Sequence, residues 1–148
     1  MEQRISAGGI VIHQNKVLLV HHYRENAFDF WVLPGGGVEG AEGFMKAVER
    51  EIFEETNLIV HADKIAYIED FIDEGRYVCK FWVYCELESG ELSLANKDSE
   101  ETFLKDAGFF SREEIQTMNV FPPILKDEFW QNLADGFSQI RYLGSSGL

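Results

Sequence analysis

Three glutamates near the middle of the chain have the spacing that brings carboxylates together on one helical surface. Glu51, Glu54 and Glu55 stand at positions i, i+3 and i+4 of a segment whose apolar residues recur with a helical period over residues 41–56. Oxygen-rich clusters of this kind suit hard divalent cations such as Mg²⁺, and the neighbouring Arg50 could orient a carboxylate. Because most charge runs on helices are only solvated faces, the cluster alone does not establish a site.

A glycine run precedes the predicted helix. Residues 34–37 read Pro-Gly-Gly-Gly, and glycines let the backbone approach an anion, or offer a carbonyl oxygen to a metal, without interference from side chains. Turns use glycine for many other reasons, so this feature is also weak by itself. The loop and the carboxylates, at this spacing, indicate a functional site together.

Residues 36–58 resemble the signature of the Nudix hydrolases. That signature has a Gly, five residues, a Glu, seven residues and then Arg-Glu-apolar-x-Glu-Glu-x-Gly-apolar. Gly36 and Glu42 take the first two places, the Arg-Glu run begins at Arg50, and Leu58 takes the last apolar place. Asn57 stands where the family has Gly, and because asparagine tolerates the left-handed conformation we expect it to end the helix in the same way.

The resemblance covers nearly the whole chain and implies an α/β (α+β) protein, the Nudix α/β/α sandwich around a mixed β-sheet. It implies hydrolysis, dependent on Mg²⁺ or Mn²⁺, of a nucleoside diphosphate linked to another moiety, such as a nucleotide, a nucleotide sugar or an ADP-ribose-like compound. Bound cations would neutralise the polyanionic diphosphate and acidify a water molecule. By position, the metal-binding groups would be the carbonyl of Gly36 and the carboxylates of Glu51, Glu54 and Glu55.

The same resemblance implies the catalytic roles. Arg50 would support the carboxylates that bind the metals. The general base varies within the family, and two kinds of candidate stay open. One is Glu54 in the signature, and the other is a glutamate of a later loop, Glu100 or Glu101.

Residues ahead of the glycine run are candidates for substrate contacts. Arg24 could hold a phosphate or a ribose through a forked hydrogen bond, and Tyr23-Arg24 is similar to a pair in some Nudix enzymes that act on ADP-ribose. Trp31, with Phe28 and Phe30, could stack on a base. The alternatives are an arginine at the end of an edge strand and aromatic residues that only fill the core.

The rest of the pattern predicts strands interleaved with a few helices. Gln14-Asn15 should turn a hairpin, and Ser111 to Glu114 has the Ser-x-x-Glu spacing of a capping box that starts a short helix. Pro122-Pro123 should open a last helix whose apolar stripe continues to Ile140. The predicted strands cover residues 5–12, 16–22, 29–34, 65–72, 77–87 and 102–110.

Length and charge limit the class of protein further. The 148 residues fit one domain, which we assign to residues 1–143, followed by a flexible tail at residues 144–148. A net charge of −13 disfavours nucleic acid and anionic membranes as partners, so we expect a small-molecule partner, with homodimers common in the family.

Location follows from what the chain lacks. With no apolar signal core and no membrane-spanning stretch, a cytoplasmic location is expected. Cys79 and Cys85 lie in one strand-like run, about 20 Å apart if extended, so they should be free thiols.

Two functions from different classes fit the pattern, namely the hydrolase and a non-catalytic Nudix module that senses a nucleotide or a sugar nucleotide. Such modules often lose carboxylates of the signature, and this chain keeps them all, which favours the hydrolase. The substrate stays open, because many ADP-ribose enzymes of the family carry a proline where this chain has Glu74.

Overall fold

The computed structural model describes residues 1–146, in which nine strands form one mixed sheet. The strand order is β8-β3-β2-β1-β6-β5-β9, and β4 and β7 pair with β1 and β2 outside this path. The β1–β6, β3–β8 and β5–β9 pairs are parallel and the others antiparallel. The strands are β1 (Glu2–His13), β2 (Lys16–Arg24), β3 (Phe28–Val32), β4 (Gly35–Gly37), β5 (Ile59–Asp73), β6 (Arg76–Ser89), β7 (Leu104–Phe110), β8 (Val120–Phe121) and β9 (Arg141–Ser146).

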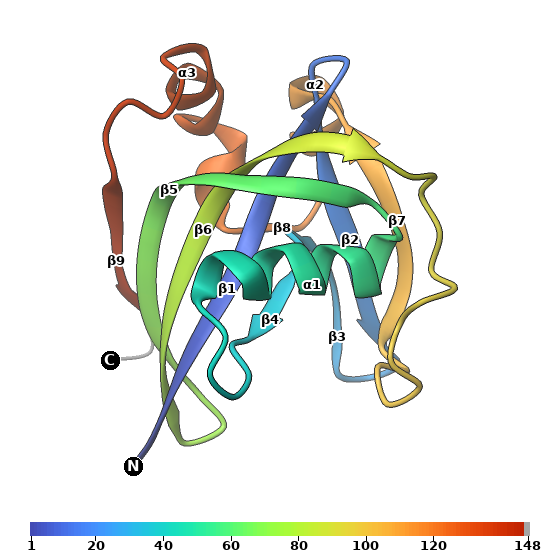
Figure 1. Cartoon of the computed structure of the whole chain (residues 1–148), viewed down its shortest axis with the longest axis vertical. Helices are drawn as coiled ribbons and strands as arrows, with labels where there is room; N and C mark the ends of the chain where they lie inside the picture. Colours follow the sequence, from blue (N-terminus) through green and yellow to red (C-terminus); the bar gives the residue numbers. More distant parts are fainter. Residues whose placement is uncertain (147–148) are drawn as a thin grey trace.

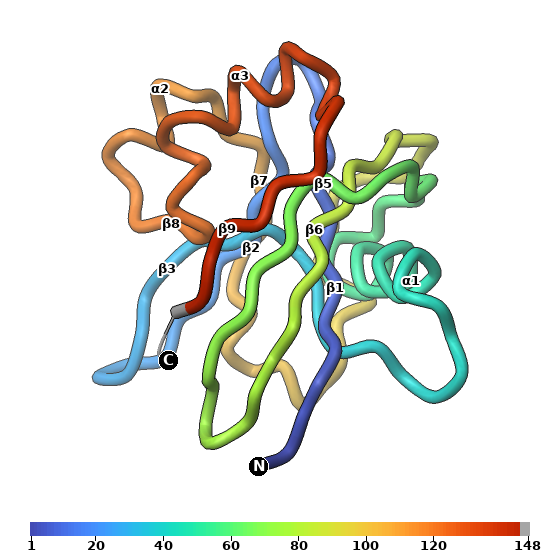
Figure 2. Tube along the Cα trace, turned by 90° about the vertical axis from the view of Figure 1, so that its left-hand side faces the viewer, coloured from blue at the N-terminus to red at the C-terminus, as the bar shows by residue number. Residues whose placement is uncertain are grey.

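Helices cover both faces of the sheet. The long helix α1 (Phe44–Thr56) crosses one face (Figure 1). Figure 2 shows α2 (Arg112–Ile115), the 3₁₀ helix η1 (Pro123–Lys126) and α3 (Phe129–Ala134) on the side of the strands opposite α1. This layering confirms the predicted α/β/α sandwich with a mixed sheet.

Each face of the sheet has its own buried cluster. Under α1, Val48 and Ile52 are fully buried against small and aliphatic residues of β1, β2, β5 and β6. A Cβ on Gly9 of β1 would stand 2.3 Å from Cδ1 of Ile52, so the close approach of α1 to the sheet depends on a glycine there. Trp82, Phe129 and their neighbours form the cluster on the other face.

Short-range predictions are confirmed. Gln14 and Asn15 adopt φ values of 51° and 62° and turn the β1–β2 hairpin. Ser111 and Glu114 form the reciprocal capping box of α2. At the end of α1, Asn57 is left-handed, with φ 66°, as expected. The helix itself begins three residues later than predicted, after Gly43, which offers no side-chain cap.

The prediction of one last helix is wrong. Asp127 leaves the helical region, with φ −140° and ψ −95°, so the segment divides into η1 and α3. Gly136 and Phe137 then adopt left-handed φ values of 69° and 49° and turn the chain into β9. As a result Ile140, at the end of the predicted stripe, is 59% exposed.

Three residues of the predicted tail belong to a strand. Residues 144–146 continue β9, where Ser145 pairs with Asp70 of β5, and residues 147 and 148 lie outside the described part. Small polar residues suggest a frayed end, but pairing with a sheet edge overrides that tendency. Cys79 and Cys85 are free, as predicted. Among the helices of residues 1–146, none has the length and apolar character needed to cross a membrane.

Candidate active site

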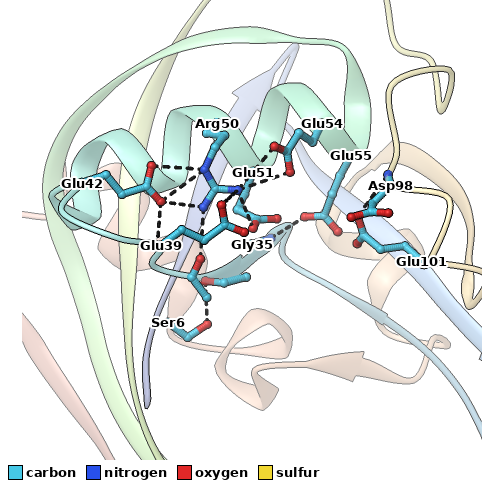
Figure 3. Close-up of polar contacts among 12 residues, drawn as sticks. Ser6, Gly35, Glu39, Glu42, Arg50, Glu51, Glu54, Glu55, Asp98 and Glu101 are labelled. Atoms are coloured by element: carbon cyan, nitrogen blue, oxygen red, sulfur yellow. Dashed lines mark hydrogen bonds and ion pairs between the residues drawn. The ribbon is translucent and has the colours of Figure 1, made fainter. Parts of the chain in front are cut away.

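The carboxylates of Glu51, Glu54 and Glu55 extend from one side of α1 toward β4 (Figure 3). Glu51 and Glu55 are buried, with 8% and 1% of their surface exposed. The side chain of Glu54 is 37% exposed. The helical spacing therefore does bring the three side chains to one surface, at the edge of the packed face of α1.

Arg50 holds this surface in place. Its Nη2 donates to Glu42 Oε1 at 2.6 Å and to the Gly37 carbonyl at 3.1 Å. Its Nη1 donates to Glu51 Oε1 at 3.0 Å and to Glu54 at 3.3 and 3.4 Å. The hydrogen bonds that Arg50 donates to Glu42 contribute most to raising the pKa of Arg50. Because its donors are engaged by the protein, Arg50 is a positioning residue that joins the glycine loop to the carboxylates.

Strand β4 brings backbone polar groups to the same place. The N–H of Gly35 donates to Glu55 Oε1 at 2.8 Å, and Ser6 Oγ donates to the carbonyl of Gly36 at 2.8 Å. A Cβ on Gly36 would stand 2.6 Å from Glu51 Oε1. The glycine run is therefore required for the close approach of the Glu51 carboxylate to the loop.

Burial and mutual repulsion disfavour the ionised forms of the buried carboxylates in the cluster. Burial raises the pKa of Glu55 well above its usual range, Glu51 and Glu101 raise it further, and the Gly35 N–H only partly opposes this. Burial also raises the pKa of Glu51 in spite of Arg50. A bound cation would favour the ionised forms of these carboxylates.

Glu101 reaches the cluster from the loop between β6 and β7. Figure 3 shows its carboxylate beside that of Glu55, and the Asp98 N–H donates to Glu101 Oε1 at 3.4 Å. Lys97 Nζ supports the loop by donating to the Glu101 carbonyl at 3.3 Å. Glu100 is exposed, and its backbone N–H donates a hydrogen bond to Oδ1 of Asp98. Of the two loop glutamates left open by the sequence, the structure brings Glu101 to the carboxylates of α1.

Tyr23 and Arg24 lie on the other side of this loop. They line a cavity of about 280 Å³ with Glu25, Thr102, Phe103 and Lys105. The Arg24 guanidinium lies over the Phe28 ring, 5.5 Å from its centroid, and the Tyr23 N–H donates to the Phe103 carbonyl at 2.9 Å. Within residues 1–146, neither side chain forms an ion pair with the carboxylates of α1.

Trp31 lies apart from the carboxylates. Its ring stacks on His21 at a centroid distance of 4.7 Å and meets Phe110 edge-on. It packs against the buried cluster on the face opposite α1. Trp31 therefore packs in the core, which is the alternative to stacking on a base.

A second cavity does not contain the carboxylate cluster. It measures about 540 Å³ and lies between β5, β9 and the segment that follows β8, with Glu69 and Tyr142 among its lining residues.

The donor set of the cluster fits a hard divalent cation. In the described part of the chain, no three His, Cys, Asp or Glu side chains already stand in a metal-binding arrangement. The available donors are nevertheless all oxygens, from carboxylates and the Gly36 carbonyl, which is the set that Mg²⁺ and Mn²⁺ prefer. A bound cation would offset the burial and the repulsion from Glu51 and Glu101 that raise the pKa of Glu55.

A profile of the NUDIX domain matches residues 2–129 of the chain. The chain belongs to the Nudix family. An ADP-ribose pyrophosphatase of Methanocaldococcus jannaschii is 31% identical to it over 132 residues, which are 86% of this chain and 75% of that protein. An 8-oxo-dGDP phosphatase of Mus musculus is 26% identical over 104 residues, which are 70% of this chain but 31% of that protein.

Solved structures with the same fold include Nudix proteins. A NUDIX hydrolase from Nitrosomonas europaea has the same fold, with a TM-score of 0.72 and 21% identity over 91% of this chain and 90% of that one. The chain is thus a Nudix hydrolase, and enzymes of this family generally use divalent metal ions.

Two polar residues near the site were not predicted from the sequence. Ser6 is fixed to the glycine loop through the Gly36 carbonyl, and Lys80 of β6 is paired with Ser6 in the sheet. The one available signal was the lysine at position 80 within an otherwise apolar strand run. Without knowledge of which strands pair with β6, that signal gives no position relative to α1.

Proposed function

We propose that this Nudix hydrolase cleaves the diphosphate bond of a nucleoside diphosphate linked to another moiety, with Mg²⁺ or Mn²⁺ as cofactor. The observation that carries the proposal is the approach of the Glu101 carboxylate to those of Glu51, Glu54 and Glu55. A polyanionic substrate is repelled by such a cluster unless cations stand between them. Substrate and cluster therefore require the same cofactor.

The cation would be held by oxygen ligands that α1, β4 and the β6–β7 loop supply. When bound, it neutralises charge on the diphosphate and lowers the pKa of a water molecule. Glu51 and Glu55 are suited to a fixed ligand role, since Arg50 holds one at 3.0 Å and the Gly35 N–H holds the other at 2.8 Å. The Gly36 carbonyl, held by Ser6, is the matching backbone ligand.

The proton of the attacking water would be taken by a carboxylate that is less firmly held. Glu54 is the most exposed of the three on α1, and its bonds to Arg50 are long, at 3.3 and 3.4 Å. Glu101 has only a 3.4 Å bond from Asp98 on its Oε1. We therefore keep the Oε atoms of Glu54 and Glu101 as the two candidates for the base.

ADP-ribose is the first substrate to test. The proposal is supported by the M. jannaschii relative, which carries the name ADP-ribose pyrophosphatase, and by the acidic chain, which favours a small substrate over a nucleic acid. The cavity beside Tyr23 and Arg24 would take a group attached to the diphosphate. The homodimer and the cytoplasmic location remain predictions.

The test is product release from a panel of nucleoside diphosphate sugars, ADP-ribose, dinucleoside polyphosphates and nucleoside triphosphates. Each compound is assayed with Mg²⁺, with Mn²⁺ and with a chelator. We expect turnover of at least one class of compound that depends on the metal. Thermal stabilisation by a nucleotide without any turnover would instead identify the sensing module.

A further inference from the structure

Lys80 places an ammonium group beside the candidate active site, and neither the fold nor the proposed mechanism uses it. The residue lies within β6, between Ser6 of β1 and Glu69 of β5 in the sheet register. Its Nζ lies 4.2 Å from the centroid of the Trp82 ring, and Trp82 is fully buried. The cation is therefore held against a buried indole instead of extending into solvent.

Lys80 lies beside the glycine loop of the site, because its register partner Ser6 donates to the Gly36 carbonyl at 2.8 Å. Burial lowers the pKa of Lys80, and Glu55, Glu69 and Glu51 oppose that effect by attraction. Within residues 1–146, its Nζ has no hydrogen bond and no carboxylate oxygen within the 4.0 Å of an ion pair. An ammonium has three N–H donors, and none of the three has a protein acceptor in the described part of the chain.

The neighbouring cations are differently placed. Arg50 is engaged by Glu42, Glu51 and Glu54, and Lys97 donates to backbone carbonyls of its own loop. Arg4, which packs against Gly37, lies near enough to Lys80 to lower its pKa. Two positive charges on β1 and β6 thus repel each other across the sheet, an arrangement that a bound polyanion would relieve.

We propose that Lys80 binds a phosphate oxygen of the substrate directly, from the side of the site opposite α1. The inference rests on the proposed function and adds to it a contact supplied by the protein itself. The diphosphate would then lie between the cation-binding carboxylates of α1 and the ammonium of Lys80. Charge-assisted hydrogen bonds to phosphate oxygens would satisfy donors that the fold leaves without partners.

The experiment measures binding instead of turnover. Isothermal titration with methylenediphosphonate in the presence of Mg²⁺ isolates the phosphate contact, because this probe is not hydrolysed and carries no organic group. The variants are Lys80→Gln and Lys80→Met, and the control is Lys64→Gln, an exposed lysine of β5. Lys80→Met keeps an unbranched stem over Trp82, so a folded variant is available even if glutamine perturbs the sheet.

Loss of the ammonium should weaken binding by about tenfold or more, while Lys64→Gln stays within about twofold of the parent. Unchanged affinity in a folded Lys80→Met protein would overturn the inference. If the parent hydrolyses a substrate while its affinity for the probe does not depend on Lys80, only this inference fails. If the parent hydrolyses nothing and the affinity does depend on Lys80, the proposed function fails and the phosphate contact stands.

Discussion

The side chain of Asn96 donates a hydrogen bond of 2.6 Å to Oδ1 of Asn57, the residue that ends α1. Asn57 Nδ2 in turn donates to the carbonyl of Glu91 at 2.8 Å. Both contacts fix the loop that continues to Glu101. The asparagine that replaces the family's glycine therefore links the helix that carries three carboxylates to the loop that carries the fourth.

Asn57→Gly should loosen this loop while leaving the fold intact. Glycine adopts the left-handed conformation without strain, and that gain offsets the two lost hydrogen bonds, so the free energy of unfolding should change by less than about 1 kcal/mol. Hydrogen exchange over residues 91–103 should become faster, and kcat should fall several-fold because Glu101 is less firmly placed.

Asn26→Gly is the matched control. Asn26 is also left-handed, with φ 61°, but it lies in the β2–β3 turn, and within residues 1–146 its side chain forms no hydrogen bond to the loop. Its substitution should leave both exchange over residues 91–103 and kcat unchanged. Equal loop exchange in the parent and in Asn57→Gly would show that the side-chain bonds of Asn57 do not hold the loop.

Arg50→Lys should lower both activity and stability. A lysine ammonium cannot bridge Glu42, Glu51 and the Gly37 carbonyl at once, so the carboxylates lose their fixed geometry. We expect kcat/KM to fall by about tenfold or more and the free energy of unfolding to fall by about 1 to 3 kcal/mol, measured by urea titration. The control Lys46→Met removes an exposed pair with Glu49 and should cost less than about 0.5 kcal/mol. A parental kcat/KM in Arg50→Lys would contradict the positioning role.

Adjacent glutamates of the β6–β7 loop provide a matched pair. Glu101→Gln removes a carboxylate that interacts with Glu51, Glu54 and Glu55, so kcat should fall by about tenfold or more whether it serves as base or as metal ligand. Glu100→Gln changes only an exposed side chain and should stay within about twofold. The measurement is the kcat of each variant on the best substrate. Equal losses of kcat in Glu101→Gln and Glu100→Gln would show that Glu101 does not act in the site.

His22 should make the protein sensitive to acid. Its ring lies between Phe30 and Phe103, with Nε2 buried and without a hydrogen-bond partner in the described residues. Burial, with smaller contributions from Lys80 and His21, lowers its pKa from 6.5 to about 4. As the pH falls below 6.5 the unfolded chain binds the proton first, so the stability associated with a neutral His22 is complete above pH 6.5 and is lost toward pH 4.

His22→Phe removes this proton uptake and keeps an aromatic ring among aromatic neighbours. Between pH 7 and pH 4.5, the stability of the variant relative to the parent should therefore rise by about 1 to 3 kcal/mol, measured by urea titration at each pH. His61→Gln, at an exposed position, should follow the parent. If the free energy of unfolding changed equally with pH in His22→Phe and in the parent, His22 would not be the cause of the acid sensitivity.

Features encoded within a few residues could be predicted from the sequence. The turn at Gln14 and Asn15, the end of α1 at Asn57 and the capping box at Ser111 each depend on local backbone preferences, and each is confirmed. The clustering of the three glutamates of α1 was also predictable, because one helical turn fixes it.

Features that depend on packing across the sheet could not be predicted. The choice between Glu100 and Glu101 depends on how the loop folds back on α1, and the position of Lys80 depends on the pairing of β6 with β1 and β5. The prediction of one last helix was wrong for a related reason, since the apolar period does not reveal the break at Asp127 or the left-handed turn at Gly136 and Phe137.

The most direct test of the central claim is the turnover of ADP-ribose, or of the best compound in the panel, by the parent and by Glu54→Gln. Both proteins are assayed with Mg²⁺, with Mn²⁺ and with a chelator, and their unfolding is measured in parallel. We predict turnover by the parent that the chelator abolishes, and a kcat lower by about two orders of magnitude or more in Glu54→Gln, with nearly unchanged stability. Near-parental turnover by Glu54→Gln, or turnover by the parent that persists in the chelator, would contradict the metal-dependent carboxylate mechanism.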